Sequence, residues 1–367
     1  MLNEYLRNLE YLVNLDCGSN TPLGIKKVTK FFQELYKDWI VEYKDLNGVN
    51  PALVIKNRDV EEFDFLFIGH NDTVFPEGTV EKRPYTIQGD IITGPGIIDM
   101  KSGLLSMYEI AKEFKNSSLN LCIIINTDEE ISSLFSRDLI SEIGRKSKNA
   151  LIFEPARKNG NLVSERKGLV KYEIDFKGKA SHAGVSPHEG INAILEASNW
   201  ILEISKLQNL DINNSINVGL ISGGIGVNTV PETCILKFEG RSHNISHFEN
   251  IFNTLENLKN NPLVPGIIVN IKEIGYRPPL VLNEKSEKLM KIFNKELKNL
   301  NIKCQWEKTG GGSDANFLGI LGVGVIDGVG PVGGGGHTDG EYIEINSIEE
   351  RINLVKNVLY TYLNNGE

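Results

Sequence analysis

Apolar runs alternate with amphipathic segments through the first half of the chain. Three runs have the length and composition of buried strands, namely residues 63–70, 121–126 and 150–153. Between the first two, apolar side chains recur at spacings of three and four: Leu104, Tyr108, Ala111 and Phe114. This spacing places them on one face of a helix. Strands that alternate with helices predict an α/β sheet with helices packed on it.

A different pattern begins near Gly168. Residues 169–177 alternate apolar and charged side chains, which is typical of a sheet with one solvated face. Helical and strand-like segments then follow in the order β-α-β-β-α-β, which is the order of a ferredoxin-like fold. Helix and strand alternate again in the last part of the chain. The pattern predicts one discontinuous domain, residues 1–167 and 277–367, and one inserted α+β domain, residues 168–276.

Composition places the chain among ordinary globular proteins. It has 367 residues, 40% hydrophobic and 24% charged, which is enough for two or three domains with large cores. Its net charge is −9 without a basic stripe, which argues against a nucleic-acid partner. No apolar run approaches the ~20 residues of a membrane helix, and charges occupy the first residues, where a signal peptide is apolar. The four cysteines are widely spaced, so we expect a cytoplasmic protein without disulfides or membrane contact.

Two of the six histidines lie where packing explains them poorly. His70 closes a predicted strand, and Asp72 follows at a spacing that puts both side chains on one strand face, where the carboxylate can fix the imidazole tautomer. His337 follows four glycines in a segment that is loop by composition. Asp99 follows a Gly-Pro-Gly turn. Glu129 and Glu130 follow the predicted strand at 121–126, and Glu154 follows the one at 150–153. Polar residues beyond strand ends are where open α/β sheets bind ligands.

Each residue also has an ordinary explanation when taken alone. A histidine at a strand end is commonly hydrogen-bonded to a nearby acidic side chain, and Asp99 at a helix start could be an N-cap. Adjacent glutamates usually mark a solvated turn, although a pair after a buried strand could divide between a metal ion and a water molecule. Two histidines and several carboxylates at strand ends together favour a shared site.

Imidazole and carboxylate groups are the ligands suited to zinc or a related divalent ion, and a bridging carboxylate is what a two-metal site needs. This set of residues indicates a hydrolase. No serine lies between glycines at the end of a strand, and no glycine-rich run ends in Lys-Ser or Lys-Thr. Serine hydrolase and nucleotidase functions are therefore disfavoured.

Eight short motifs follow one another along nearly the whole chain: GHNDTVFPEG, GPGIIDMKSG, TDEE, FEP, GKASHAG, GGIGVNTVP, TGGGSDANF and GGGGHTDGE. In this order they resemble the motifs of the dizinc aminoacylase and carboxypeptidase metallopeptidases, in particular the bacterial glutamate carboxypeptidases that cleave folates. The resemblance implies a mixed-sheet zinc-peptidase catalytic domain and an inserted ferredoxin-like domain that serves as lid and dimerisation domain.

The resemblance also implies the metal ligands. They are His70 and Glu154 for one zinc ion, Glu130 and His337 for the other, and Asp99 as the bridge. Asp72 would orient His70, and Glu129 would be the general base that moves a proton from the attacking water to the leaving nitrogen. Alternatively, Glu129 would only accept a hydrogen bond from a metal ligand, without taking part in proton transfer. Cobalt or manganese could replace zinc in such a site.

Residues of the inserted domain receive roles in the same way. His182 corresponds to a residue that reaches across a homodimer and binds the oxyanion in the partner's active site, although a structural role in a small-residue turn is the alternative. Asn228 and Arg241 correspond to groups that hold the substrate's terminal carboxylate. Gly310 and Gly311 would line the cleft. Arg277 could add a cationic contact or be a hinge residue with a surface salt bridge.

Two departures from the family pattern affect what we expect. Ser102 stands where glycine is usual after Asp-Met-Lys, which bears on the helix start and not on the ligand. The third acidic ligand is Glu154 in place of aspartate, and within the family glutamate is found in carboxypeptidase and deacylase branches.

We therefore expect a metal-dependent exopeptidase or amidohydrolase that acts on small peptides or N-acyl amino acids. A carboxypeptidase that releases a C-terminal residue, such as glutamate, is favoured. The alternatives are an aminopeptidase or dipeptidase, an N-acyl-amino-acid deacylase of the same fold, and a zinc-dependent binding protein without activity. The presence of Glu129 argues against the last alternative, because binding alone needs no general base.

Overall fold

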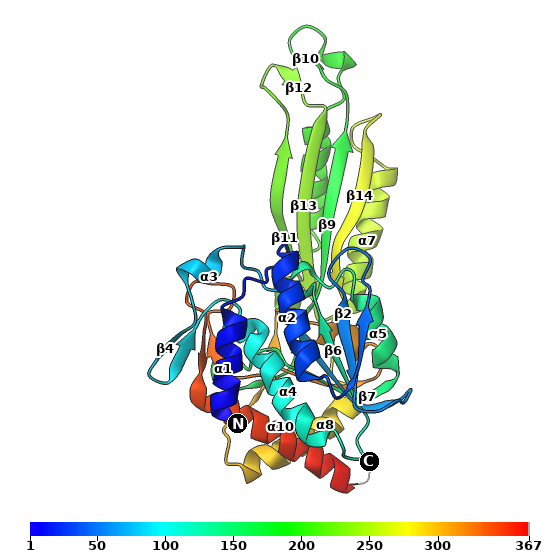
Figure 1. The fold of residues 1–367 in the computed structure, drawn as a ribbon. Coiled ribbons are helices and arrows are strands. Elements are labelled where there is room, and N and C mark those ends of the chain that lie inside the picture. The colour runs from blue at the N-terminus through cyan, green and yellow to red at the C-terminus, as the bar shows by residue number, and fades with distance from the viewer. Residues whose placement is uncertain (366–367) are drawn as a thin grey trace. The chain divides into compact units, whose positions relative to one another are not determined.

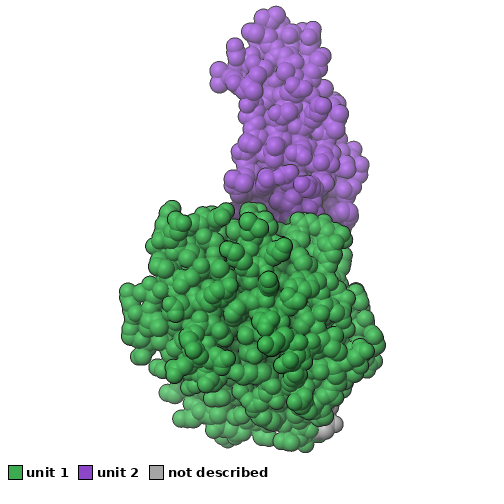
Figure 2. Space-filling view, in the orientation of Figure 1, with its two compact units in different colours: residues 1–166, 280–309, 313–367 green, residues 167–279, 310–312 purple. Residues whose placement is uncertain are grey.

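The computed structural model describes residues 1–365. The chain forms two compact units, shown in different colours in Figure 2. The first unit comprises Met1–Arg166, Leu280–Thr309 and Ser313–Glu367, and the second comprises Lys167–Pro279 and Gly310–Gly312. Within the described residues, no helix combines the length and the apolar character needed to cross a membrane. All four cysteines are free thiols.

A mixed sheet of eight strands lies at the centre of the first unit (Figure 1). Its order is β1 (Ile40–Lys44), β2 (Ala52–Lys56), β6 (Leu121–Asn126), β3 (Phe63–His70), β7 (Ser147–Ile152), β16 (Gly324–Asp327), β8 (Leu162–Arg166) and β15 (Trp306–Thr309). The three predicted strands are β3, β6 and β7, and β3 pairs in parallel with both others. The predicted α/β class is confirmed. Because parallel strands end at one edge of a sheet, the residues that follow these three strands are brought together.

Helices cover both faces of this sheet. Successive residues of β3 enter two different cores, since Phe65 and Phe67 pack in one and Leu66 and Ile68 in the other. The first core includes residues of α1 (Leu2–Val13), α2 (Pro22–Leu35), α4 (Ser102–Phe114), α8 (Glu284–Asn299) and α10 (Ile345–Asn365). The second core includes residues of α5 (Arg137–Arg145) and α9 (Ala315–Gly319). Burial on both faces explains why β3 is an unbroken apolar run instead of an alternating one.

A small antiparallel sheet in the first unit connects two loops that are distant in sequence. Its order is β17 (Gly333–Gly334), β18 (Tyr342–Glu344), β5 (Ile91–Thr93) and β4 (Thr86–Gln88). After β5 the chain passes through the turn η1 (Ile97–Lys101) into α4, and His337 lies in the loop between β17 and β18. Tyr342 pairs with Thr93, so the turn after β5 lies beside the loop before β18. Two further short elements are α3 (Thr79–Lys82) and η2 (Glu129–Ile131).

The second unit has the predicted β-α-β-β-α-β order. Its antiparallel sheet has the order β11 (Ser215–Gly223), β13 (Thr233–Ser242), β9 (Gly168–Lys177) and β14 (Ile268–Arg277). The helices are α6 (Ala193–Ser205) and α7 (Ile245–Asn260), begun by the caps Asn192 and Asn244. Ile174 and Phe176 of β9 pack with Trp200 of α6, as the alternating pattern predicts. The strands β10 (Ser181–His182) and β12 (Thr229–Val230) form an additional antiparallel pair.

The points where the chain leaves and re-enters the first unit lie side by side. Arg166 and Leu280 form an antiparallel bridge, in which each backbone N–H donates to the other residue's carbonyl oxygen at 3.0 Å. In the second unit, a Cβ on Gly168 would lie 2.6 Å from the backbone oxygen of Arg277. Only glycine fits at this close approach of two backbones.

Candidate metal centre

His70 is the last residue of β3 and is buried. Its Nδ1 lies 2.9 Å from the backbone oxygen of Asp72 and 3.4 Å from the carboxylate of the same residue. A carbonyl oxygen can only accept, so Nδ1 carries a proton, and in the neutral ring the lone pair lies on Nε2. The expectation that both residues share a strand face is wrong, because the strand ends at His70. Asp72 lies beyond the strand end, and its backbone oxygen, not its carboxylate, makes the shorter contact with the imidazole ring.

The Asp72 carboxylate has a second role in positioning. It accepts hydrogen bonds from the backbone N–H groups of Glu129 and Glu130 at 3.1 and 3.2 Å and from the Ser19 hydroxyl at 2.8 Å. The turn η2, which carries both glutamates, is therefore fixed to the segment that follows His70.

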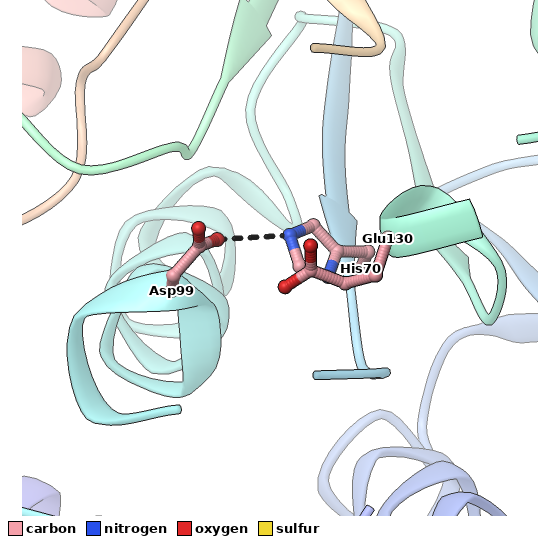
Figure 3. Close-up of side chains that lie close together, drawn as sticks. All are labelled: His70, Asp99 and Glu130. Atoms are coloured by element: carbon pink, nitrogen blue, oxygen red, sulfur yellow. Dashed lines mark hydrogen bonds and ion pairs between the residues drawn. The ribbon is translucent and has the colours of Figure 1, made fainter. Parts of the chain in front are cut away.

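Asp99 lies at the centre of the site. The expectation that it begins the helix after Gly-Pro-Gly is wrong, because α4 begins at Ser102 and Asp99 has the extended angles φ −123° and ψ 92° within η1. Its Oδ1 lies 3.1 Å from Nε2 of His70, and its Oδ2 lies 3.1 Å from Nε2 of His337. The two imidazoles thus face the two oxygens of one carboxylate, and Figure 3 shows His70 and Glu130 beside Asp99.

Glu154 and Glu130 complete two groups of ligands around Asp99. Glu154, two residues beyond β7, places an oxygen 3.7 Å from Nε2 of His70. Glu130 places Oε2 3.3 Å from Nε2 of His337. The structure therefore brings together all five residues that the sequence indicated as metal ligands, and it groups them as His70 with Glu154 and His337 with Glu130.

These distances fit the coordination shell of a divalent ion. Ligand atoms at 2.0–2.2 Å from a tetrahedral metal lie about 3.3 to 3.6 Å from one another, and the four contacts above span 3.1 to 3.7 Å. His70, Asp99 and Glu130 also offer three ligand atoms that all lie within 4.8 Å of one another. Among the described residues, the buried Oε1 of Glu130 has no hydrogen-bond partner. A buried oxygen without a donor is costly, and a bound cation would satisfy it.

Crowded acidic groups shift the pKa values in the direction expected of a cation site. Burial raises the pKa of Glu154 well above its usual value, and the charge of Asp99 adds to this effect. Hydrogen bonds with Asp99 and Glu130 raise the pKa of His337 to about 11. Burial also raises the pKa of Glu130. Burial thus makes the charged forms of Glu130 and Glu154 unfavourable, and divalent ions would favour these charged forms.

Glu129 lies on η2 directly before Glu130 and is partly exposed. Its charge contributes to the raised pKa of Glu154, so it lies close to this group of acidic residues.

The predicted residues of the second unit lie in two separate places. His182, in β10, pairs with Thr229, and the backbone oxygen of Asn228 accepts the N–H of Ala183 at 2.9 Å. Arg241 lies at the far end of β13, where Glu239 accepts from its Nε at 2.9 Å and the backbone oxygen of Gly310 accepts from its Nη1 at 2.9 Å. Arg241 lies eight residue steps along β13 from Thr233, at the end of the strand that follows β12, a span of about 26 Å.

Two other expectations for this unit can be compared with the structure. Arg277 is only 2% exposed, so a surface salt bridge is wrong for it. Its side chain packs beside the glycine run, since a Cβ on Gly312 would lie 2.9 Å from Cδ of Arg277. Gly311 lies in the same run and belongs to the second unit.

Sequence reasoning did not identify Glu341 or Lys101, which support the site. Glu341 accepts three backbone hydrogen bonds from the turn that carries Asp99. Lys101 is buried and donates to the backbone oxygens of Leu15 and Pro95 at 2.9 and 3.0 Å. Both residues lie inside glycine-rich motifs, Lys101 in GPGIIDMKSG and Glu341 in GGGGHTDGE. Their charge was the signal that could have identified them, because charged side chains are rarely buried without a structural or chemical reason.

Known proteins resemble this chain over almost its full length. Carboxypeptidase G2 from Pseudomonas sp. (strain RS-16) is 29% identical over 370 residues, covering 96% of this chain and 88% of that protein. Succinyl-diaminopimelate desuccinylase from Aliarcobacter butzleri is 24% identical over 352 residues, covering 90% and 93%.

Solved structures share the fold at lower identity. The aminopeptidase PepT from Bacillus cereus matches with a TM-score of 0.76 and 20% identity, covering 98% of both chains. An M20 family metallo-carboxypeptidase from Sulfolobus solfataricus matches with a TM-score of 0.76 and 17% identity, covering 97% of this chain and 98% of the other.

The model of one peptidase family matches residues 66–361, which include all five candidate ligands. This confirms the resemblance drawn from the motifs and the predicted class of enzyme, a metal-dependent hydrolase. The chain belongs to peptidase family M20/M25/M40.

Proposed function

We propose that this protein is a metal-dependent carboxypeptidase that releases a C-terminal amino acid, glutamate in particular, from a small peptide or N-acyl amino acid. The observation that carries the metal dependence is the pairing of both imidazole Nε2 atoms with the two oxygens of Asp99 at 3.1 Å. Similarity to the Pseudomonas carboxypeptidase supports the direction of cleavage, as does glutamate at position 154. The free thiols agree with the cytoplasm as the proposed compartment.

Five residues would hold two divalent ions. His70 and Glu154 would bind one ion, and Asp99 would be shared with a second ion on the other side. Glu130 and His337 would bind that second ion. Zinc suits this set of imidazole and carboxylate ligands, with cobalt or manganese as substitutes. When bound, such ions lower the pKa of water and stabilise negative charge on the substrate's oxygen.

Glu129 would transfer the proton during hydrolysis. It takes a proton from the water that attacks the carbonyl carbon, and it gives this proton to the nitrogen as the C–N bond breaks. The hydrogen bond from its backbone N–H to Asp72 fixes the turn from which the side chain extends.

A substrate panel tests the proposed specificity. We expect the zinc-loaded protein to hydrolyse acyl-glutamates, and amidation of the substrate's α-carboxylate to abolish turnover, because the recognised group is then neutral. Removal of metal by a chelator should abolish activity, and zinc should restore it. If blocking a free amine abolishes turnover instead, the protein is an aminopeptidase. Activity that is unaffected by chelation would contradict the proposed metal centre.

The second unit supports a homodimeric active site. No small substrate can contact both His182 and Arg241 of one chain, because about 26 Å of β13 lies between their ends of the sheet. If both act on one substrate, two chains must supply them. The strand β11 offers a surface for such an assembly: it is an edge strand with Leu220 65% and Ile221 49% exposed, and exposed apolar edges favour pairing with another chain.

Mixed dimers test whether His182 acts across the interface. We expect His182→Ala and Glu129→Gln to be nearly inactive separately, and co-refolded mixtures to regain about a quarter of wild-type activity, since half the dimers are mixed and each has one intact site. The intact site combines Glu129 of one chain with His182 of the other. If His182 serves its own chain, both sites of a mixed dimer are defective and no activity returns. An active monomer would also contradict the assignment.

A further inference from the structure

Glu341 is a buried acid that the proposed metal binding and proton transfer do not use. It is 1% exposed and lies between the His337 loop and β18. Its Oε2 accepts the backbone N–H of Gly96 at 2.9 Å. Its Oε1 accepts the N–H groups of Ile98 and Asp99 at 2.8 and 3.1 Å. Both carboxylate oxygens are thus directed at the main chain of the turn that carries Asp99.

The local fold explains why the acid reaches this turn. The pairing of β18 with β5 places residue 341 beside the end of β5, where the turn begins. Gly96 has a positive φ of 69°, and a Cβ there would lie 2.5 Å from Cγ2 of Thr73. This left-handed conformation helps to aim successive N–H groups into one concave site, which suits an anionic acceptor.

The three hydrogen bonds connect two segments that each supply a metal ligand. Asp99 belongs to one segment, and His337 lies four residues before Glu341 in the other. The distance between them, 3.1 Å from Nε2 to Oδ2, depends on how these segments are held together. Within the described chain, Arg83 adds an exposed connection to the His337 loop, through the backbone oxygen of Thr338 at 3.2 Å and the carboxylate of Asp339 at 3.4 Å.

We propose that Glu341 is a positioning residue of the metal centre, which holds Asp99 and His337 at the spacing that two ions require. This inference rests on the proposed function, because it concerns the same site. Glu341 is not one of the five proposed ligands; it acts through the main chain of Gly96, Ile98 and Asp99. Partners that orient metal ligands typically change metal affinity by about tenfold to a hundredfold when removed.

The test measures zinc affinity directly, by competition with a fluorescent chelator. We expect Glu341→Gln to weaken zinc binding by about tenfold to a hundredfold. The amide keeps one acceptor oxygen, but its NH₂ group replaces the other oxygen and faces backbone N–H groups, with which it cannot form a hydrogen bond. The matched control is Glu344→Gln, three residues further on, whose carboxylate accepts no hydrogen bond from residues 1–365. The control should bind zinc as the wild type does.

A purely structural role would give a different result. In that case Glu341→Gln would lower the unfolding temperature of the metal-free protein and leave zinc affinity unchanged, which would overturn the inference while the proposed function stands. If the variant fails to fold, Glu341→Asp serves in its place, since it retains both oxygens on a shorter arm. Unchanged zinc affinity in that variant, with wild-type unfolding, would also overturn the inference. Absence of zinc binding by the wild type would overturn the proposed metal centre itself.

Discussion

Replacement of Asp99 by asparagine is expected to abolish metal binding at one or both positions and to lower turnover by about a thousandfold or more. The amide is isosteric, so packing is retained, but one of the two oxygens becomes an NH₂ group that cannot bind a cation. Both histidines face this side chain at 3.1 Å, so the substitution affects both groups of ligands. Loss of several kcal/mol of charge stabilisation corresponds to a factor of this size.

Metal analysis of the purified variant, together with turnover at saturating zinc, measures this effect. The matched control is Asp90→Asn, an exposed aspartate between β4 and β5, which should retain full metal content. Two bound ions and near-normal turnover in the Asp99 variant would show that Asp99 does not bridge the site.

Replacement of Glu129 by glutamine is expected to lower turnover by about a hundredfold or more while the metal content stays at the wild-type level. Glutamine retains the shape of the side chain and the backbone bond to Asp72, but it cannot accept and release a proton. Removal of a positioned general base typically costs about 10²–10⁴ in rate. The KM should change little, because the five ligands and the substrate contacts are intact.

Steady-state kinetics with metal analysis on the same preparation separates a lost base from a lost ligand. Glu142→Gln provides the control, since Glu142 is exposed on α5 and paired with Lys146. Turnover near the wild-type value in the Glu129 variant would assign proton transfer to another group. Loss of metal in that variant would instead make Glu129 a ligand.

Local patterns were sufficient to predict most of the fold. The run from Phe63 to His70 predicted a buried strand, and the alternation through Ile174 and Phe176 predicted a sheet with one covered face, because both signals arise from residues adjacent in sequence. The short strands β10 and β12 were missed, since two residues each carry no periodicity. The start of α4 was placed too early because the turn at Asp99 has angles that depend on contacts made elsewhere.

The candidate site was predictable where a ligand follows a recognisable strand or turn. His70 is the last residue of β3, and Glu130 and Glu154 follow β6 and β7, so the parallel pairing of these strands brings the three residues together. Glu341 could not be found in this way, because its role depends on the pairing of β5 with β18, some 250 residues apart in the chain. The burial of Arg277 was also unpredictable, since nothing in its immediate sequence indicates which side of β14 is covered.

The bridge between Arg166 and Leu280 makes the second unit a replaceable module. An insertion whose two ends are adjacent leaves its host sheet almost as it would be without the insertion, so each part can change its sequence under separate constraints. The five proposed metal ligands all belong to the host, whereas His182, Asn228 and Arg241, the proposed substrate contacts, all belong to the insert. The residues proposed for catalysis and those proposed for substrate recognition thus lie in different stretches of the chain. This separation offers a physical reason why one fold includes a carboxypeptidase, a desuccinylase and an aminopeptidase.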